Sequence, residues 1–145
     1  MNISGGSSPS SGDALKRIKI AGRKSMSTGT KQSPRVENGV LKWYVGNAFY
    51  INFTITNDSD GKLLGFNEND YVKVIFRDKR RIIKTFDVRE VEEGRIQIHM
   101  DSRSTCLFGV GKYHYDIELY RNGGETIQTL YKCGEAEVEG CDEWA

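Results

Sequence analysis

The fold of this 145-residue chain is decided by one stretch, Gly111-Lys112-Tyr113-His114-Tyr115-Asp116-Ile117-Glu118-Leu119-Tyr120. From Tyr113 to Leu119, every second residue is aromatic or aliphatic. The residues between them are His114, Asp116 and Glu118. An alternation of this kind is typical of a β-strand with one face in the core and the other toward water. The stretch therefore predicts a strand at the centre of a β-sheet.

The same pattern recurs on both sides of this strand. The other predicted strands are residues 40–45, 49–56, 71–76, 82–88, 95–100, a hairpin partner at 126–131 and a short last strand at 135–138. Most are bounded by Gly, Asn or Asp, and no long helix is indicated. The pattern predicts an all-β fold, an immunoglobulin-like antiparallel β-sandwich of seven or eight strands, with a barrel as the alternative. Trp43 is expected in the core, and residues 63–66 are expected to close one end of it.

Composition divides the chain into three regions. Residues 1–35 are predicted to be a flexible arm, residues 36–139 the sandwich, and residues 140–145 an acidic tail. The arm begins with a Ser/Gly-rich lead without the apolar segment of a secretory signal. Asp13–Arg35 holds seven Lys or Arg against one Asp, a net charge of +6, whereas Gly134–Ala145 holds five Asp or Glu and no Lys or Arg. Within the arm, a helical turn that starts at Asp13 and a short strand at residues 17–20 are both compatible with the sequence.

The charged arm and the C-terminal Trp supply the candidate partner-binding residues. These are Lys16, Arg17, Lys19, Arg23, Lys24 and Trp144. Opposed charges at the two ends favour docking to another protein or to a neighbouring copy of the chain. Nucleic acid is the alternative partner, because cations neutralise phosphates. It is disfavoured, since no aromatic residue interleaves the basic segment and the body is neutral overall.

The residues that could carry chemistry do not form a motif. His99 and His114 are expected on outward strand positions, and a nucleophile–base pair built from Asp101, Cys106 and nearby serines would need side chains that point to alternate faces. The sequence therefore predicts no catalytic residue, no metal site and no cofactor. Of the three cysteines, Cys106 is expected to be buried, while Cys133 and Cys141 either pair or stay reduced.

The order of features over residues 43–138 resembles a known family, the immunoglobulin-like N-terminal domain of phage baseplate upper proteins and related small virion proteins. The matching pieces are Gly46-Asn47-Ala48-Phe49, Asp60-Gly61-Lys62 with Leu63-Leu64, Gly94-Arg95-Ile96-Gln97-Ile98, Ser104-Thr105, Gly111–Leu119, the Gly123-Gly124 turn, and Thr129-Leu130 before Gly134.

This resemblance implies a non-enzymatic structural module of a tailed-phage virion. Such a module attaches to a tail, baseplate, neck or capsid platform, in contact with other virion proteins and with symmetric copies of itself. In the family the domain leads into a linker or fibre, which this sequence does not contain, so we expect an accessory or connector protein, made in the host cytoplasm and docked through its arm. The alternative is a stand-alone immunoglobulin-like module that binds a cell-surface protein or glycan.

Overall fold

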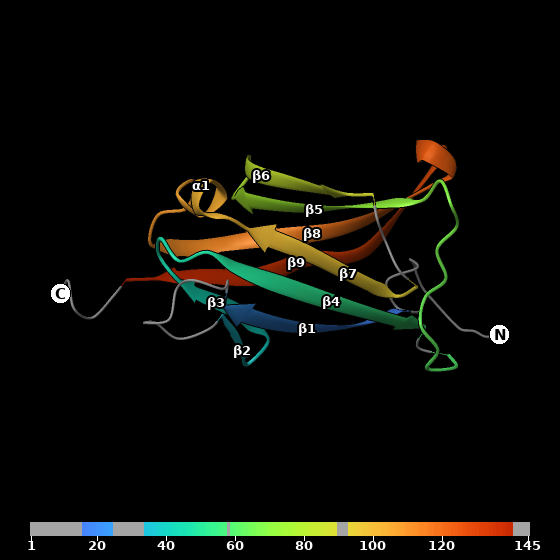
Figure 1. Ribbon diagram of the computed structural model, residues 1–145, viewed down its shortest axis with the longest axis horizontal. Helices are drawn as coiled ribbons and strands as arrows, with labels where there is room; N and C mark the ends of the chain where they lie inside the picture. The colour runs from blue at the N-terminus through green and yellow to red at the C-terminus, as the bar shows by residue number, and fades with distance from the viewer. Residues whose placement is uncertain (1–15, 25–33, 58, 90–92, 141–145) are drawn as a thin grey trace.

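The computed structural model describes residues 16–24, for which only the backbone is considered, and residues 34–57, 59–89 and 93–140 with their side chains. The strands within them are β1 (Lys16–Lys24), β2 (Arg35–Glu37), β3 (Val40–Tyr44), β4 (Phe49–Asn57), β5 (Tyr71–Asp78), β6 (Arg81–Val88), β7 (Arg95–Met100), β8 (Gly111–Arg121) and β9 (Thr126–Glu139) (Figure 1). Two short helical turns, α1 (Ser102–Thr105) and η2 (Asn122–Gly124), flank β8.

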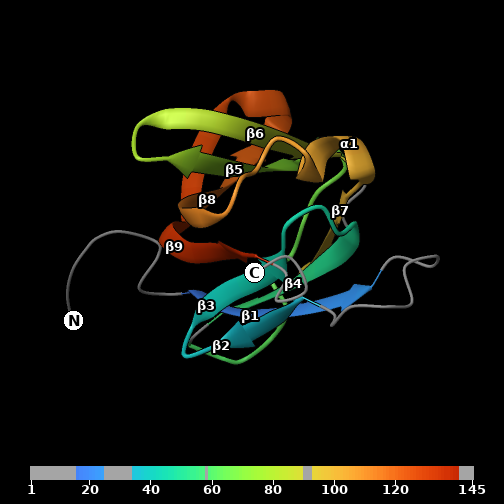
Figure 2. The ribbon, with the colours of Figure 1, turned by 90° about the vertical axis from the view of Figure 1, so that its left-hand side faces the viewer.

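The strands form two sheets that face each other, which confirms the predicted all-β sandwich. One sheet has three strands in the order β1-β4-β7, and the other has six in the order β2-β3-β9-β8-β5-β6. The larger sheet curls so that β2 comes beside β1 on one side of the sandwich (Figure 2). One expectation is wrong in detail: β3 and β9 run parallel, while the other strand pairs are antiparallel.

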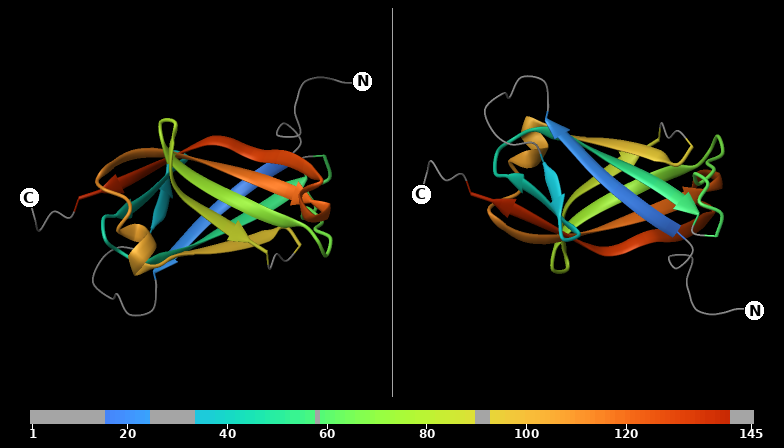
Figure 3. Two further views of the ribbon diagram at one scale, coloured as in Figure 1. Left: turned by 90° about the horizontal axis from the view of Figure 1, so that it is seen from above. Right: turned by 90° about the horizontal axis from the view of Figure 1, so that it is seen from below.

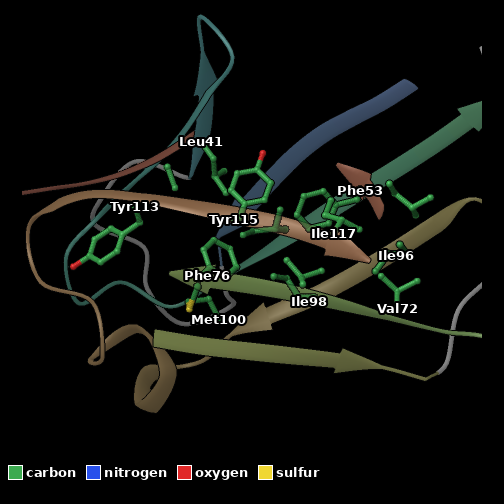
Figure 4. Close-up of a cluster of buried hydrophobic side chains, with 14 of the residues drawn as sticks. Leu41, Phe53, Val72, Phe76, Ile96, Ile98, Met100, Tyr113, Tyr115 and Ile117 are labelled. Atoms are coloured by element: carbon green, nitrogen blue, oxygen red, sulfur yellow. The ribbon is translucent and has the colours of Figure 1, made fainter. Parts of the chain in front are cut away.

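The predicted central strand is β8, which pairs with β5 on one side and β9 on the other. Its alternate residues Tyr113, Tyr115, Ile117 and Leu119 are buried, as predicted. They meet Phe53 of β4 and Ile96 and Ile98 of β7 in the core between the sheets (Figure 4). Trp43 is also buried and packs edge-on against the rings of Phe76 and Phe108. Burial of these large apolar side chains is the main force that holds the two sheets together.

The two short strands expected at residues 126–131 and 135–138 are one bent strand, β9. The bend lies at Cys133, whose φ of 58° is left-handed, and the pairing with β8 shifts register nearby. Gly134 follows, and a Cβ built there would lie 2.5 Å from the rings of both Tyr115 and Tyr131. A larger residue therefore cannot occupy position 134 without moving the buried Tyr115.

The N-terminal segment requires a correction. The sequence places residues 1–35 in an arm outside the sandwich, but residues 16–24 form β1, an edge strand paired with β4 along its whole length. Ile18 and Ile20 pair with Ile55 and Phe53, which β4 buries. Register is set where one face of a strand is buried, which accounts for this pairing. The rest of the predicted arm before residue 34 and the tail residues 141–145, including Trp144, lie outside the described residues.

The link between β4 and β5 behaves as predicted at one end of the core. Leu64 is buried and Phe66 packs against the same cluster of core side chains. Leu63 forms an isolated bridge with Thr56, and the backbone N–H of Leu64 donates to the carbonyl of Ile55 at 3.0 Å. These contacts hold the irregular segment over the open end between the sheets.

Candidate interaction surfaces

The five predicted partner-binding cations all lie on β1, at the free edge of the three-stranded sheet. The register places Arg17, Lys19 and Arg23 opposite Thr56, Thr54 and Tyr50 of β4. Directly paired residues of antiparallel strands share a face of the sheet. Positions 17, 19 and 23 therefore belong to the outward face, which the view from below in Figure 3 shows.

The outward side of the three-stranded sheet is here called the basic face. It comprises positions 17, 19, 21 and 23 of β1, Tyr50, Asn52, Thr54 and Thr56 of β4, and Arg95, Gln97 and His99 of β7. The β4 members are half-buried and the β7 members are exposed. The set contains neither a carboxylate nor an aliphatic side chain longer than alanine. The face therefore combines positive charge with planar polar groups.

Cross-strand pairs order this face between β4 and β7. The rings of Tyr50 and His99 stack with centroids 4.2 Å apart and an angle of 13° between their planes. One register step along, Gln97 Nε2 donates to Asn52 Oδ1 at 2.8 Å. Arg95 is paired with Thr54 at the next outward position. Ring, amide and guanidinium groups thus follow one another along the same two strands.

The outward face of the six-stranded sheet has a different composition. On β2, β3 and β9, cations alternate with carboxylates: Arg35 contacts Glu37 at 2.5 Å and Glu139 at 2.7 Å, and Lys42 lies 3.5 Å from Glu37. The hydrogen bond from Arg35 holds the pKa of Glu37 below its ordinary value. Here most charged groups are already neutralised by a neighbour within the sheet.

Asp116 lies at the centre of that sheet, and here the prediction from alternation is wrong. The carboxyl was expected in water, but the residue is only 5% exposed. Arg77 Nε donates to Asp116 Oδ2 at 3.1 Å, and the Cys133 backbone N–H donates to Oδ1 at 2.8 Å. Burial alone would raise the pKa of Asp116, but these donors outweigh it and the pKa lies below its ordinary value. The bend of β9 at Cys133 is what brings this donor over the carboxylate.

A second buried carboxylate, Asp70, holds the loops at the end of the sheet. It accepts hydrogen bonds from the backbone N–H groups of Asn67 at 2.7 Å and Asn122 at 3.1 Å, and from Arg121 Nη1 at 2.7 Å. Burial would raise the pKa of Asp70, yet the three donors keep it lowered. Its lone pairs are used within the fold, so Asp70 is a structural group.

The residues considered for catalysis do not converge. Asp101 caps α1 by accepting a hydrogen bond from the Ser104 backbone N–H at 2.7 Å, and this bond lowers its pKa. Cys106 is exposed, which corrects the expectation that it is buried. It is the residue that follows α1, and its side chain is not part of the core. Among residues 16–24, 34–57, 59–89 and 93–140, no group of three or more His, Cys, Asp or Glu is placed to hold a metal ion.

Of the two alternatives for Cys133, a disulfide with Cys141 or a reduced thiol, the structure has the reduced thiol. Cys133 is free and exposed, and Arg77 Nη2 lies 3.2 Å from its sulfur. Cys141 lies outside the described residues. A search of the described helices finds none that is both long and apolar enough to cross a membrane.

An apolar end is formed where β3, β9 and β8 meet. Its members are Val45 and Val110, exposed by 37% and 64%, and Leu107, exposed by 53%, lies in the same link between α1 and β8 as Val110. The Val45 backbone N–H donates to the carbonyl of Glu139 at 2.9 Å, and a Cβ built on Gly140 would lie 3.8 Å from Val110. Val45 and Val110 therefore flank the end of β9. Exposed apolar side chains that gather in one place are typical of protein contacts.

Neither surface was identified as such from the sequence. Tyr50, Asn52, Gln97 and His99 are visible there only as outward positions of two predicted strands. Their identity as a cross-strand group depends on β4 pairing with β7, which the pattern within a single strand does not specify. The only available signal was the shared lack of carboxylates at outward positions of the two strands.

Comparison with known proteins adds no assignment: no model of a known protein family matches the chain, and no curated protein is similar to it in sequence. The role of the chain is therefore argued from its two surfaces.

Proposed function

We propose that the protein is a non-enzymatic structural component of a tailed-phage virion that docks on a larger platform of the particle. The observation that carries this proposal is the apolar end, where Val45 and Val110 are exposed on either side of the end of β9 and Leu107 is exposed in the loop that leads to Val110. Exposed apolar side chains that lie close together mark sites of protein–protein contact. The resemblance of residues 43–138 to phage baseplate domains supports the same role.

The N-terminal segment is the second proposed contact with the platform. Because β1 is bound to β4 along nine residues, the segment is attached to the sandwich at its edge strand. A partner that binds residues 1–15 or 25–33 would therefore also fix the position of the sandwich. In this proposal the apolar end and the N-terminal segment act together, and copies of the chain occupy equivalent places on a symmetric platform.

The test is incorporation into particles. Virions are purified from a host strain that produces the tagged chain, and its amount per particle is measured by quantitative mass spectrometry. Leu107→Asp combined with Val110→Asp is expected to reduce incorporation by at least about tenfold, because a charge at the anchor opposes its burial. The matched control is Ile127→Asp, which changes an equally exposed residue (56%) at the far end of β9.

Two results would contradict the proposal. One is a wild-type chain absent from purified particles. The other is a chain that stays monomeric and binds host cells through a surface protein or glycan, which is the alternative role. Equal losses for the apolar-end variant and the Ile127 control would show that the apolar end is not the contact.

A further inference from the structure

The Lys and Arg positions of the basic face favour an anionic partner. Four cations, Arg17, Lys19 and Arg23 by register on β1 and Arg95 on β7, border a strip of neutral polar side chains. No outward position of β4 or β7 carries an Asp or Glu to neutralise them. By register, positions of cationic residues line the β1 edge and Arg95 lies on the β7 edge, while the outward positions of β4 between them are uncharged. An extended polyanion could follow the strip with cations on both sides.

The chemistry between the cations favours nucleobases over an acidic protein. No outward side chain of β4 or β7 is aliphatic, so an acidic protein would find only Tyr50 and Arg95 as anchors of the kinds that protein contacts favour. Instead the strip offers the Tyr50–His99 ring stack and the Asn52–Gln97 amide pair. Aromatic rings stack on bases whatever their sequence, and amides match the donors and acceptors of base edges.

Space for a base exists beside His99. A groove of about 650 Å³ runs between the edges of β6 and β7, and its polar walls are Asp87, Arg89, Gln97 and His99. Phe86, Val88 and Ile98 supply its apolar lining. Arg89 contacts Asp87 at 3.3 Å, so a base at this edge would meet the His99 imidazole and the Gln97 amide next to a neutralised ion pair. A duplex holds its bases in its own stack, so this arrangement suits a single strand.

We propose that the basic face binds single-stranded nucleic acid, with phosphates along β1 and Arg95 and bases against the Tyr50–His99 pair and the neighbouring groove. This inference goes beyond the proposed function and does not depend on it, since the apolar end lies on other strands. The sequence predicted a protein partner for five basic residues, and this inference replaces it with a nucleic acid. They are Lys16, Arg17, Lys19, Arg23 and Lys24. The sequence counted against nucleic acid because no aromatic residue interleaves the basic segment; the fold supplies the aromatic groups from the adjacent strands.

The experiment measures fluorescence anisotropy of a labelled oligothymidylate of about 20 nucleotides titrated with the full chain at several salt concentrations. Binding in the micromolar range is expected at low salt, with an affinity that falls steeply as salt rises. Arg95→Gln is expected to reduce the slope of log affinity against log salt by about 0.7, the value for one lost phosphate contact. Its matched control, Arg81→Gln, removes an exposed cation from β6 and should leave the slope unchanged.

A second variant tests stacking separately from charge. His99→Ala is expected to weaken oligothymidylate binding by at least about fivefold, because a stacked base loses its platform. His114→Ala, on a strand of the other sheet, is the matched control. Circular dichroism of each variant verifies that the sandwich is intact, and the Arg95 variant remains as a test should His99→Ala fail to fold.

Polyglutamate and duplex DNA of similar length serve as competing probes. At least about tenfold weaker competition by polyglutamate than by the single strand is expected, since it offers charge without bases. Equal competition by polyglutamate, together with no effect of His99→Ala, would overturn the proposal in favour of an acidic protein. Absence of binding at low salt would overturn it outright. Neither result bears on particle incorporation, which tests the apolar end.

Discussion

The two outward faces of the sandwich differ in how their polar side chains are paired. On the six-stranded sheet, cations and carboxylates contact each other, from the pairs around Arg35 to the buried Asp116 under Arg77. On the three-stranded sheet, the outward positions of β4 and β7 are neutral or basic, and contacts join Tyr50 to His99 and Asn52 to Gln97. The first arrangement neutralises charge within the fold, whereas the second places no carboxylate among the outward positions of β4 and β7.

The difference teaches where stability and binding reside in this protein. A buried carboxylate with three donors cannot lose a partner without leaving a desolvated charge behind. An exposed amide or ring on an outward face can be changed at little cost, because water replaces the lost contact. Substitutions on the six-stranded face should therefore act on folding, and substitutions on the basic face should act on binding.

The largest expected effect is at Asp116. Asp116→Ala should lower the free energy of unfolding by about 3 kcal/mol, since Arg77 and the Cys133 N–H lose a buried acceptor. Urea denaturation followed by circular dichroism measures the change. Asp87→Ala is the control, because Asp87 is exposed and its contact with Arg89 at 3.3 Å lies in water. A loss at Asp116 no larger than that at Asp87 would contradict the view that the buried carboxylate stabilises the six-stranded sheet more than an exposed one does.

Acid should weaken the six-stranded side through the same carboxylate. The pKa of Asp116 is lowered in the folded state, so the unfolded chain takes up the proton first as pH falls. The stabilisation is complete above the ordinary carboxyl pKa of 3.8 and is lost as pH drops through the lower folded value. The difference in unfolding free energy between wild type and Asp116→Asn should therefore be greatest at neutral pH and should shrink below about pH 4. A difference that stays constant from pH 7 to about pH 3 would contradict this account.

The smallest expected effect is on the basic face. Gln97→Ala should change the free energy of unfolding by less than about 0.5 kcal/mol, because its bond to Asn52 is exposed. Arg35→Ala on the other face is the comparison and should cost about 1 kcal/mol, because it loses contacts with Glu37 and Glu139. The same urea series measures both. A larger loss at Gln97 than at Arg35 would show that the basic face is held together for stability.

Sequence periodicity was a good guide wherever burial alone decides the outcome. The alternation from Tyr113 to Leu119 correctly predicts the central strand, and Trp43 and Leu64 lie in the core as expected. The alternation gave wrong predictions of burial where contacts between residues far apart in the chain determine it. Asp116 alternates like a water-facing residue, but it is covered by Arg77 of β5 and by the bend of β9. Cys106 was expected to be buried as a small apolar residue, but it is exposed, whereas Phe108 two residues later lies in the core.

The amino-acid sequence by itself determined that this chain is all-β, because the two-residue period of apolar side chains must bury one face of each strand; the pairing into two sheets decided for a sandwich over a barrel. It also determined that positive charge is concentrated before residue 36. Only the tertiary structure decided that part of this basic segment is an edge strand and that Tyr50 and His99 lie beside it. The physical reason is that strand pairing joins backbones far apart in the chain, and the neighbours it creates are not encoded in the period of any single strand.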